Sequence, residues 1–452
     1  MTFTIPGLDV ITDAGVLASL AHDDAEWAPW GPPRGAVRPR TTEEVARVVR
    51  FCAGHDIPIV TRGAGTGLSG GANAVDGCVV VDLSRMNRVL SVDADNMVAV
   101  VQPGVINDHL KAAVAEHGLW YPPDPASAPW STIGGNVATN AGGLCCLKYG
   151  VTRDYVLGLE VVAGGPAGDY GTVVRLGRRT TKGVAGYDLV GLFVGSEGTL
   201  GIVTEVTLRL RPARREAPRT VVGAFDSLVA AGAAVAESTR RGLLPAALEL
   251  LDRTCLRAVE DWKHLGLATD AEALLLAQID TPGDAEATAM ADAFRSAGAL
   301  WAEQSTDEFE AEALFAARRL AYPALERLGP VLTEDVCVPR SAVPRMLAAV
   351  AGIAQRHGAH IATIAHAGDG NLHPLILTPA GDDAAREAAQ AAFREIIAAA
   401  VELGGTVTGE HGVGLLKRDG MRLELSAENL LMQEAVKRTF DPRNLFNPGK
   451  VL

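Results

Sequence analysis

The sequence predicts an α+β protein of more than one domain, and three observations support this. The chain has 452 residues, which is longer than a single hydrophobic core usually organises. Short β-type apolar runs alternate with amphipathic helical segments along most of its length. Its 49 glycines gather in clusters that interrupt both patterns. Apolar residues make up 48% and charged residues 21%, an ordinary balance for a folded chain.

The composition also disfavours several classes of protein. Lys and Arg total 41 against 54 Asp and Glu, a formal net charge of −13. An acidic chain without a basic tract repels polyphosphates, so we expect no nucleic-acid partner. No apolar stretch approaches the roughly 18–20 residues that span a bilayer, and the N-terminus lacks the basic segment of a signal peptide. We therefore expect a cytoplasmic protein with no membrane span.

The cysteines give no sign of a metal cluster or a disulfide framework. Two of them are adjacent, none forms a C-x-x-C pair, and no spacing is repeated among Cys52, Cys78, Cys145, Cys146, Cys255 and Cys337. We expect reduced side chains and no Cys-ligated iron–sulfur cluster in this chain. Electrons from any redox reaction would then have to leave to an external acceptor.

The first half of the chain predicts strands separated by two helices and long loops. Thr41 with Glu44 three residues later is a helix-start pattern. A second helix is expected at 106–117, and the Pro-, Gly- and Asn-rich segment 122–143 reads as a long functional loop. The expected strands are 36–38, 57–60, 78–83, 97–101, 158–162 and 199–210.

A charged, proline-containing run at 209–219 predicts a domain boundary. Beyond it, strands are expected at 221–224, 246–251, 273–279, 331–338, 359–365 and 372–377. Helices are expected at 227–241, from 252, from 285, and at 343–357, 382–403 and 427–440. This alternation predicts a sheet covered by helices on one face. We divide the chain into 1–33, 34–213, 214–403 and 404–452.

The first glycine cluster fits a phosphate-binding loop. Gly65, Gly67 and Gly70 satisfy G-x-G-x-x-G, but a strand follows them, whereas a Rossmann loop opens into a helix. No G-K-[ST] is present either. Glycine allows successive backbone N–H groups to converge on an anion. The alternative is a long hairpin connection.

Two further segments combine glycine with hydroxyl and amide groups, at 131–143 and 195–201. Glycine lets the backbone approach a ligand closely, and the hydroxyl and amide groups can donate or accept hydrogen bonds. Together they suit binding of a flat polar ring. They favour the phosphate-binding interpretation of the first cluster over a hairpin connection.

Two histidines near the C-terminus predict a metal site. His366 and His373 flank a Gly-Asp-Gly turn, where a hairpin would place both rings on one side of a strand pair. A carboxylate from the later G-E-H-G segment, Glu410, completes three ligands and leaves a position open for a substrate. The alternative is that each histidine is an ordinary buried polar residue.

At this point the sequence resembles known flavoproteins. TRGAGTGLSGGA (61–72), PPDPAS (122–127), STIGGNVATNAGG (131–143), KGVAGYDL (182–189) and GSEGTLGIVTEVTL (195–208) are similar to the FAD-binding domain of vanillyl-alcohol-oxidase-type flavoproteins. The resemblance covers about 34–213 and implies that Arg62–Gly71 binds the pyrophosphate. It implies FAD contacts for Arg62, Gly63, Ala64, Gly65, Thr66, Gly67, Ser69, Gly70, Asp124, Ser127, Thr132, Gly134, Gly135, Asn136, Thr139, Asn140, Gly142, Glu197, Gly198, Ile202 and Val203. Covalently flavinylated relatives carry His where Thr66 stands, so non-covalent FAD is expected.

The C-terminal motifs resemble those of FAD-linked 2-hydroxyacid dehydrogenases, which include D-lactate dehydrogenase, the glycolate oxidase flavin subunit and D-2-hydroxyglutarate dehydrogenase. H-x-G-D-G-N-x-H (366–373), G-E-H-G-V-G (409–414) and FDPRNLFNPGK (440–450) carry the match. The resemblance implies that His366, His373 and Glu410 bind one divalent metal, zinc or manganese. It also implies catalytic roles for three residues: His411 as base, Arg318 as carboxylate clamp, and Asn371. In this reading 34–213 binds FAD, 214–403 is an α+β substrate (cap) domain, and 404–452 is a C-terminal helical segment that carries the catalytic loop and returns to the FAD domain.

The implied reaction is oxidation of a D-2-hydroxy acid to the 2-oxo acid, with the hydride passing to flavin N5. The adjacent Glu410 and His411 would diverge, one toward metal and one toward substrate. Thr333 stands where relatives that act on dicarboxylates carry Lys, which favours D-lactate or glycolate. Alternatives are D-2-hydroxyglutarate oxidation, a non-redox alkyl-dihydroxyacetone-phosphate-synthase-like enzyme, or a flavin-binding subunit of a larger oxidase. The electron acceptor would be a quinone, a cytochrome, an electron-transfer flavoprotein or an iron–sulfur subunit.

Overall fold

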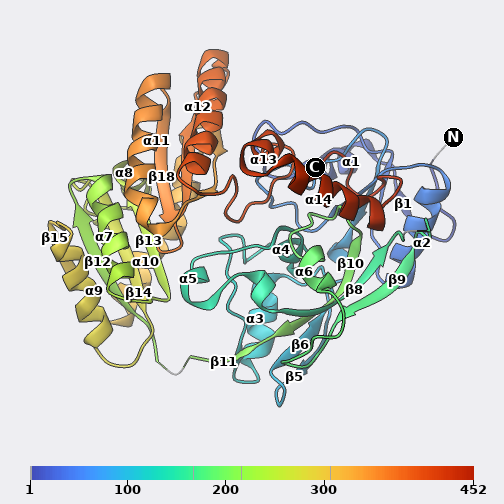
Figure 1. Ribbon diagram of the computed structural model, residues 1–452, viewed down its shortest axis with the longest axis horizontal. Helices are drawn as coiled ribbons and strands as arrows, with labels where there is room; N and C mark the ends of the chain where they lie inside the picture. The colour runs from blue at the N-terminus through green and yellow to red at the C-terminus, as the bar shows by residue number, and fades with distance from the viewer. Residues whose placement is uncertain (1–2, 166, 215, 306) are drawn as a thin grey trace. The chain divides into compact units, whose positions relative to one another are not determined.

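The computed structural model describes residues 3–165, 167–214, 216–305 and 307–452. Residues 1–2, from the expected N-terminal segment, and 215, from the expected boundary run, lie outside the described residues. The chain forms two compact units, shown in Figure 1. Unit 1 contains Met1–Gly142, Gly150–Ala213 and Glu410–Leu452; unit 2 contains Gly143–Tyr149 and Arg214–Gly409.

Unit 1 contains two sheets. The first has the strand order β1-β2-β4-β3, formed by β1 (Val10–Ile11), β2 (Gly35–Val37), β3 (Ile59–Arg62) and β4 (Val79–Asp82). The second has the order β5-β6-β10-β8-β9, formed by β5 (Val89–Asp93), β6 (Val98–Val101), β8 (Val156–Ala163), β9 (Thr172–Gly177) and β10 (Ile202–Arg209). A small ribbon pairs β7 (Leu119–Trp120) with β11 (Arg211–Pro212).

The described part of unit 1 also contains helices, several of which pack against these sheets. They are α1 (Ala14–Leu20), α2 (Thr42–Gly54), α3 (Asn107–Ala115), α4 (Ile133–Thr139), α6 (Leu189–Phe193), α13 (Arg418–Glu424) and α14 (Ala427–Phe440). As expected, Thr41 caps α2 by accepting a hydrogen bond from the Glu44 amide. Within the segment expected to be a loop, Thr132 caps α4 in the same way. The loop prediction failed there because α4 is short, with 7 residues, and two of them are glycines that disfavour a helix.

Unit 2 is built on one antiparallel sheet with the order β15-β12-β14-β13-β18-β19-β16, and β17 also pairs with β19. All of its described strand pairs are antiparallel. The strands are β12 (Arg219–Phe225), β13 (Ala247–Asp252), β14 (Ala273–Ile279), β15 (Trp301–Gln304), β16 (Val331–Thr333), β17 (Val336–Cys337), β18 (His360–His366) and β19 (Asn371–Leu377). The single strand expected at 331–338 is therefore two short strands.

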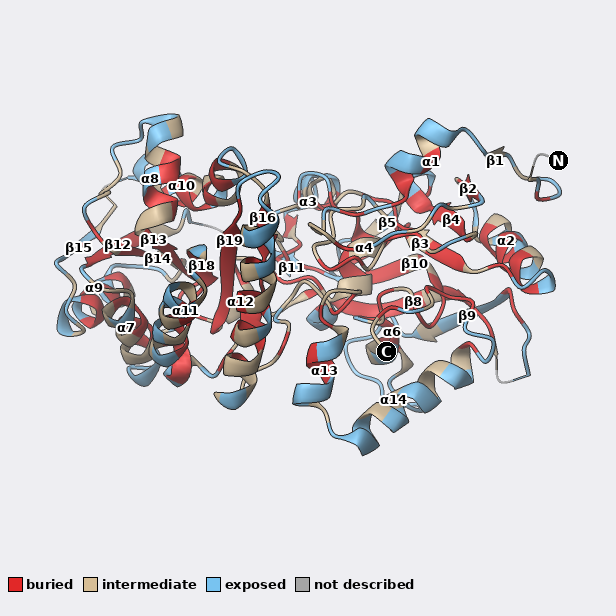
Figure 2. Ribbon diagram, turned by 90° about the horizontal axis from the view of Figure 1, so that it is seen from above, coloured by how far each residue is buried: buried red, intermediate tan, exposed pale blue. Residues whose placement is uncertain are grey.

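The helices of unit 2 lie on both faces of this sheet, as Figure 2 shows, so the one-face prediction was wrong. Every residue of β13 and β19 is buried, which requires cover on both sides. The helices are α5 (Cys146–Tyr149), α7 (Leu228–Arg240), α8 (Arg253–Lys263), α9 (Ala285–Ser296), α10 (Glu308–Glu326), α11 (Val343–His357) and α12 (Asp383–Glu402). None of the described helices is long and apolar enough to cross a membrane.

The helices α8 and α10 share one core with one face of the sheet. Leu256 of α8 and Phe315 of α10 pack in a buried cluster with Leu251, Ile364 and Leu375 from three neighbouring strands. This face of the sheet, called the α10 face below, carries the polar residues described next.

Candidate active site

The three glycine-rich segments of unit 1 lie against one another. A Cβ built on Gly63 would lie only 2.4 Å from Oγ1 of Thr132, and one on Gly71 would lie 3.0 Å from Oε2 of Glu197. Gly65 has φ +84°, and its Cβ would lie 2.0 Å from the Arg62 guanidinium. Glycine is therefore needed where the segments meet, both for conformation and for space.

The first of these segments carries backbone N–H groups that have no acceptor among the described residues. Among the described residues, no hydrogen bond is donated by the backbone N–H groups of Ala64–Leu68. Gly65–Leu68 are only partly accessible to solvent. A run of partly accessible donors without an acceptor among the described residues fits an anionic ligand such as a pyrophosphate.

The chain itself uses several side chains that the resemblance assigned to FAD. The Asn136 carboxamide accepts from Asn107 Nδ2 at 3.0 Å and donates to Ser131 Oγ at 3.2 Å. Arg62 donates to the carbonyl of His22 at 2.6 Å. These side chains hold the loops in shape, which leaves backbone groups to face a cofactor. Of the remaining candidates, Asp124, Ser127, Gly142 and Gly198 lie in loops, Gly134, Gly135 and Thr139 lie in α4, Asn140 is its left-handed C-cap, and Ile202 and Val203 begin β10.

Glu197 joins the glycine-rich segments to the segment that carries His411. Its buried carboxylate accepts from the amides of Val413 at 2.7 Å and Gly414 at 2.8 Å. Burial raises the pKa of the Glu197 carboxyl to about 7. Ser69 Oγ adds hydrogen bonds to the carbonyls of His411 and Gly412. Unit 1 therefore fixes the backbone of the predicted base.

In unit 2 the strand register places polar side chains in a row on the α10 face. Leu250 pairs with Ala365, and extending this register by one residue brings Glu249 opposite His366. His366 in turn pairs directly with Asn371. Cross-strand partners share a face of a sheet, so these three side chains are neighbours. His373 follows Asn371 on the same face, because side chains alternate along a strand.

Glu249 contacts two of the predicted site residues. Its carboxylate lies 2.9 Å from Nδ1 of His366 and accepts from Nε of Arg318 at 2.9 Å. Relative exposure is 0% for the Glu249 side chain, 6% for Arg318 and 8% for His366. In the described part of the chain, the two Nη groups of Arg318 make no hydrogen bond. They are available to a substrate carboxylate.

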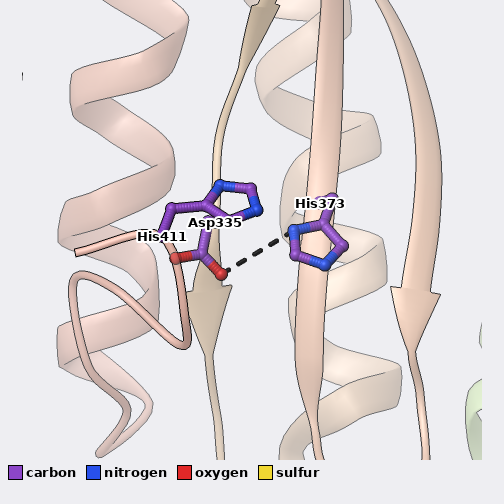
Figure 3. A group of neighbouring side chains, drawn as sticks. All are labelled: Asp335, His373 and His411. Atoms are coloured by element: carbon purple, nitrogen blue, oxygen red, sulfur yellow. Dashed lines mark ion pairs between the residues drawn. The ribbon is translucent and has the colours of Figure 1, made fainter. Parts of the chain in front are cut away.

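The second histidine also faces a buried carboxylate. Nδ1 of His373 lies 3.7 Å from Oδ1 of Asp335, the ion pair drawn in Figure 3. Asp335 accepts from Thr408 Oγ1 at 2.7 Å and from the Gly409 amide at 3.0 Å. The two imidazole rings are 5.1 Å apart. The hairpin predicted to bring them together is thus present, with β18 and β19 as its strands.

Glu410 and His411 directly follow Gly409, so chain connectivity keeps their Cα atoms within about 4 and 8 Å of the Gly409 Cα. Two groups of three side chains have possible ligand atoms within 4.8 Å of one another: His366, His373 and Glu410, and Asp335, His373 and His411 (Figure 3). Oε1 of Glu410 lies 4.0 Å from Nε2 of His411. The ends of these two side chains therefore lie close together, and the expected division of roles, one toward metal and one toward substrate, stays a prediction.

Asn371 supports a ligand at this place. Its Oδ1 is buried and has no hydrogen-bond partner among the described residues, an arrangement that costs free energy unless a ligand compensates it. A Cβ on Gly409 would lie 2.4 Å from that oxygen, so glycine is required beside it.

Comparison with known proteins identifies the family. Residues 33–177 match the FAD binding domain family, and 214–451 match the family described as FAD linked oxidases, C-terminal domain. The chain belongs to the FAD-linked oxidases. It is 44% identical over 423 residues to the glycolate oxidase subunit GlcD of Bacillus subtilis, covering 93% of this chain and 89% of that protein. It is 36% identical to a D-lactate dehydrogenase of Archaeoglobus fulgidus, covering 96% of each chain.

Solved structures of other proteins share the fold of this FAD-linked oxidase. A p-cresol methylhydroxylase with substrate bound matches with a TM-score of 0.81 at 18% identity, over 98% of this chain and 93% of that one. An alkyldihydroxyacetonephosphate synthase matches with a TM-score of 0.72 at 20% identity, over 99% and 83%. At these identities the matches show the shared fold alone. The vanillyl-alcohol-oxidase-type fold and the FAD-linked oxidoreductase class predicted from the sequence are confirmed.

Sequence reasoning missed two acidic residues of the FAD-linked oxidase. Glu249 lies 117 positions before His366 in the chain, and nothing local marks it except a charge inside the apolar run ALELLD. Asp335 lies in TEDVCVP, where two adjacent acids interrupt a strand-like run. A charge in a run that otherwise predicts a buried strand was the available signal, because such charges are buried only with partners.

Proposed function

We propose that the chain oxidises a small 2-hydroxy acid, D-lactate or glycolate, to the 2-oxo acid, with non-covalent FAD and one divalent metal ion. The observation that carries this is the group formed by His366, His373 and Glu410 beside the buried Arg318 guanidinium, in a chain of this oxidase family. The names of the relatives, glycolate oxidase subunit and D-lactate dehydrogenase, support the substrate class.

The residues of unit 1 fit FAD. The unsatisfied donors of Ala64–Leu68 suit its pyrophosphate, and the close-packed glycines leave backbone to approach its ring. When bound, FAD supplies the acceptor for the hydride that the substrate carbon loses. Thr66 has no imidazole with which to form a covalent link, which supports non-covalent binding.

The donor set of unit 2 and the residues that follow it fit a divalent ion. Two imidazoles and a carboxylate are ligands that zinc and manganese accept, and three protein ligands leave room for substrate oxygens. Such an ion supplies a Lewis acid that lowers the pKa of a bound hydroxyl. The Glu249 carboxylate faces Nδ1 of His366 at 2.9 Å, which leaves Nε2 as the ligand atom of that histidine.

The remaining roles belong to side chains. Arg318 binds the substrate carboxylate through its two Nη groups, a planar geometry that guanidinium matches. His411 accepts the proton of the α-hydroxyl as the Cα hydrogen leaves, so that a carbonyl forms. Asn371 Oδ1 is buried without a hydrogen-bond partner among the described residues, and we assign it to the substrate or to the ion.

The reduced enzyme must pass its electrons to an external acceptor. No C-x-x-C pair occurs in the sequence, so no Cys-ligated cluster is expected to receive them within this chain. Two relatives are named as subunits of glycolate oxidase, from Bacillus subtilis and Escherichia coli, which supports a partner subunit as the acceptor. A quinone, a cytochrome or an electron-transfer flavoprotein are the other candidates.

Anaerobic mixing of the purified protein with single 2-hydroxy acids tests the proposal. D-lactate or glycolate should bleach the visible absorbance of the flavin, and L-lactate should do so far more slowly. The same bleaching is measured with metal-stripped protein and with stripped protein reloaded with zinc or with manganese. Bleaching that survives stripping would remove the metal from the proposal. Flavin that stays with acid-precipitated protein would contradict non-covalent binding.

A further inference from the structure

We infer that Glu249 is a positioning residue that sets both the tautomer of His366 and the orientation of Arg318. Its carboxylate contacts both the predicted metal ligand and the predicted substrate clamp, at 2.9 Å to each. The metal and substrate consequences of this inference rest on the proposed function. The tautomer consequence does not, because it concerns the metal-free protein.

Chemistry fixes the direction of each hydrogen bond. An ionised carboxylate only accepts, so Nδ1 of His366 must carry the proton and Nε2 must present its lone pair. The two Nδ1 distances to Oε1 and Oε2 are equal at 2.9 Å, so the ring faces the carboxylate squarely. Metal-binding histidines usually donate their second ring N–H to a carboxylate, a backbone carbonyl or water, and loss of that partner weakens metal binding.

The same carboxylate orients the guanidinium. Arg318 donates through Nε, the inner nitrogen, which leaves the outer pair of Nη groups directed away from Glu249. A guanidinium that donates through Nε cannot rotate its two Nη groups to a new direction without losing that hydrogen bond. Since both side chains are buried, the charge of Arg318 is balanced by Glu249 and not by water.

Strand register makes this arrangement rigid. Glu249 lies in the fully buried β13, opposite His366 at the end of β18, while Arg318 comes from α10 across the face. Three different elements therefore meet at one carboxylate. A salt bridge that served stability alone would not need the imidazole as a second partner.

The first test compares Glu249→Gln with a control on the same strand. Asp252→Asn removes another buried carboxylate of β13, one that accepts from the amides of Cys255 and Thr363 and contacts none of the proposed site residues. Glu249→Gln should weaken zinc or manganese binding about 10–100-fold and raise KM for the 2-hydroxy acid, with FAD content unchanged. Asp252→Asn should lower the melting temperature and leave the metal affinity and the KM for the 2-hydroxy acid unchanged.

Equal metal affinity in folded Glu249→Gln and in the wild type would overturn the inference. An equal weakening in both variants would also overturn it, because the effect would then be structural. These outcomes presuppose that the wild type binds a divalent ion. If it binds none, the metal half of the proposed function fails, and the next measurement decides the inference alone.

Imidazole ¹⁵N NMR of the metal-free protein gives that measurement. His366, assigned by its loss in His366→Gln, should show a protonated Nδ1 and an unprotonated Nε2. Glu249→Gln should shift the ring toward the Nε2-protonated form, because the single amide oxygen must then serve both Arg318 and His366. A wild-type His366 protonated at Nε2 and not at Nδ1 would overturn the inference with or without a metal.

Discussion

The glycine segments of unit 1 and the α10 face of unit 2 are built from opposite parts of the amino acid. In unit 1 the groups available to a ligand are backbone amides, and side chains such as Asn136 and Arg62 are engaged with the chain itself. In unit 2 the available groups are buried side chains on neighbouring strands. One site is made by the absence of Cβ atoms, the other by a row of imidazole, amide and carboxylate groups.

This difference determines how each site can be broken. A backbone site should resist removal of single side chains and should fail when a Cβ is added at a crowded glycine. A side-chain site should behave in the reverse way, since β-strands hold their backbone whatever the side chain. Each of the following predictions tests one side of that contrast.

The largest expected effect belongs to a single imidazole. His411→Asn should slow flavin reduction by about 10²–10⁴, the usual contribution of a positioned base. FAD and metal content should stay at wild-type levels, because Ser69 and Glu197 hold the backbone here and not the ring. His360→Asn, at an exposed histidine that begins β18, is the control. Stopped-flow reduction measures both, and a variant as fast as the wild type would place the base elsewhere.

A pair of substitutions should separate the two sites. Gly65→Ala should lose FAD, because its φ of +84° disfavours a side chain and the new Cβ would meet the Arg62 guanidinium. His366→Ala should lose the metal and keep FAD. Gly118→Ala is the matched control: its φ is +67°, but no atom lies within 4 Å of the added Cβ. Flavin absorbance and metal analysis give the readouts, and loss of both cofactors in either variant would contradict two independent sites.

The sequence predicted most of the fold for a physical reason. Apolar periodicity and capping residues act locally, so strands such as β12 and β14 and helices such as α2 and α11 appear close to their expected places. The prediction failed where local signals conflict. Glycines hid α4, a Pro inside α10 weakened its helical pattern, and acidic residues between β16 and β17 divided an expected strand.

The site was predictable only in part, for a different reason. His366 and His373 come from one hairpin, so their proximity follows from seven residues of sequence. Glu249 reaches His366 only through the order of strands in the sheet, which no local pattern encodes. The same holds for Arg318, whose Nε contact required knowing which face α10 covers. The roles of these residues stay predictions until the variants are measured.

A smaller effect should appear as the contribution of Glu197, in unit 1, to the pH dependence of stability. The folded-state pKa of Glu197 is raised to about 7 from an unfolded value near 4.5. Its protonated form is therefore favoured by folding, so stability is greatest below the unfolded pKa and falls as pH rises through about 7. The melting temperature should drop by a few degrees between about pH 5 and pH 8. In Glu197→Gln the fall in melting temperature that comes from ionisation of Glu197 should vanish. Melting temperatures that fall in parallel with pH in both proteins would contradict the role of Glu197.

The smallest expected effect concerns substrate choice on the α10 face. Thr333 pairs with Leu375, one same-face position from His373, and its Oγ1 is buried without a hydrogen-bond partner among the described residues. A hydroxyl cannot balance the second carboxylate of D-2-hydroxyglutarate, and an unpaired buried charge costs several kcal/mol. Arg319, the nearest basic residue to Arg318 in sequence, is exposed and paired with Glu312. The wild type should therefore show a higher kcat/KM for D-lactate or glycolate. Thr333→Lys should narrow or reverse the ratio of kcat/KM for D-lactate or glycolate to kcat/KM for D-2-hydroxyglutarate. Thr333→Val should leave this ratio unchanged. A wild type that prefers the dicarboxylate by about tenfold, or 1.4 kcal/mol, would mean that another cation serves that carboxylate.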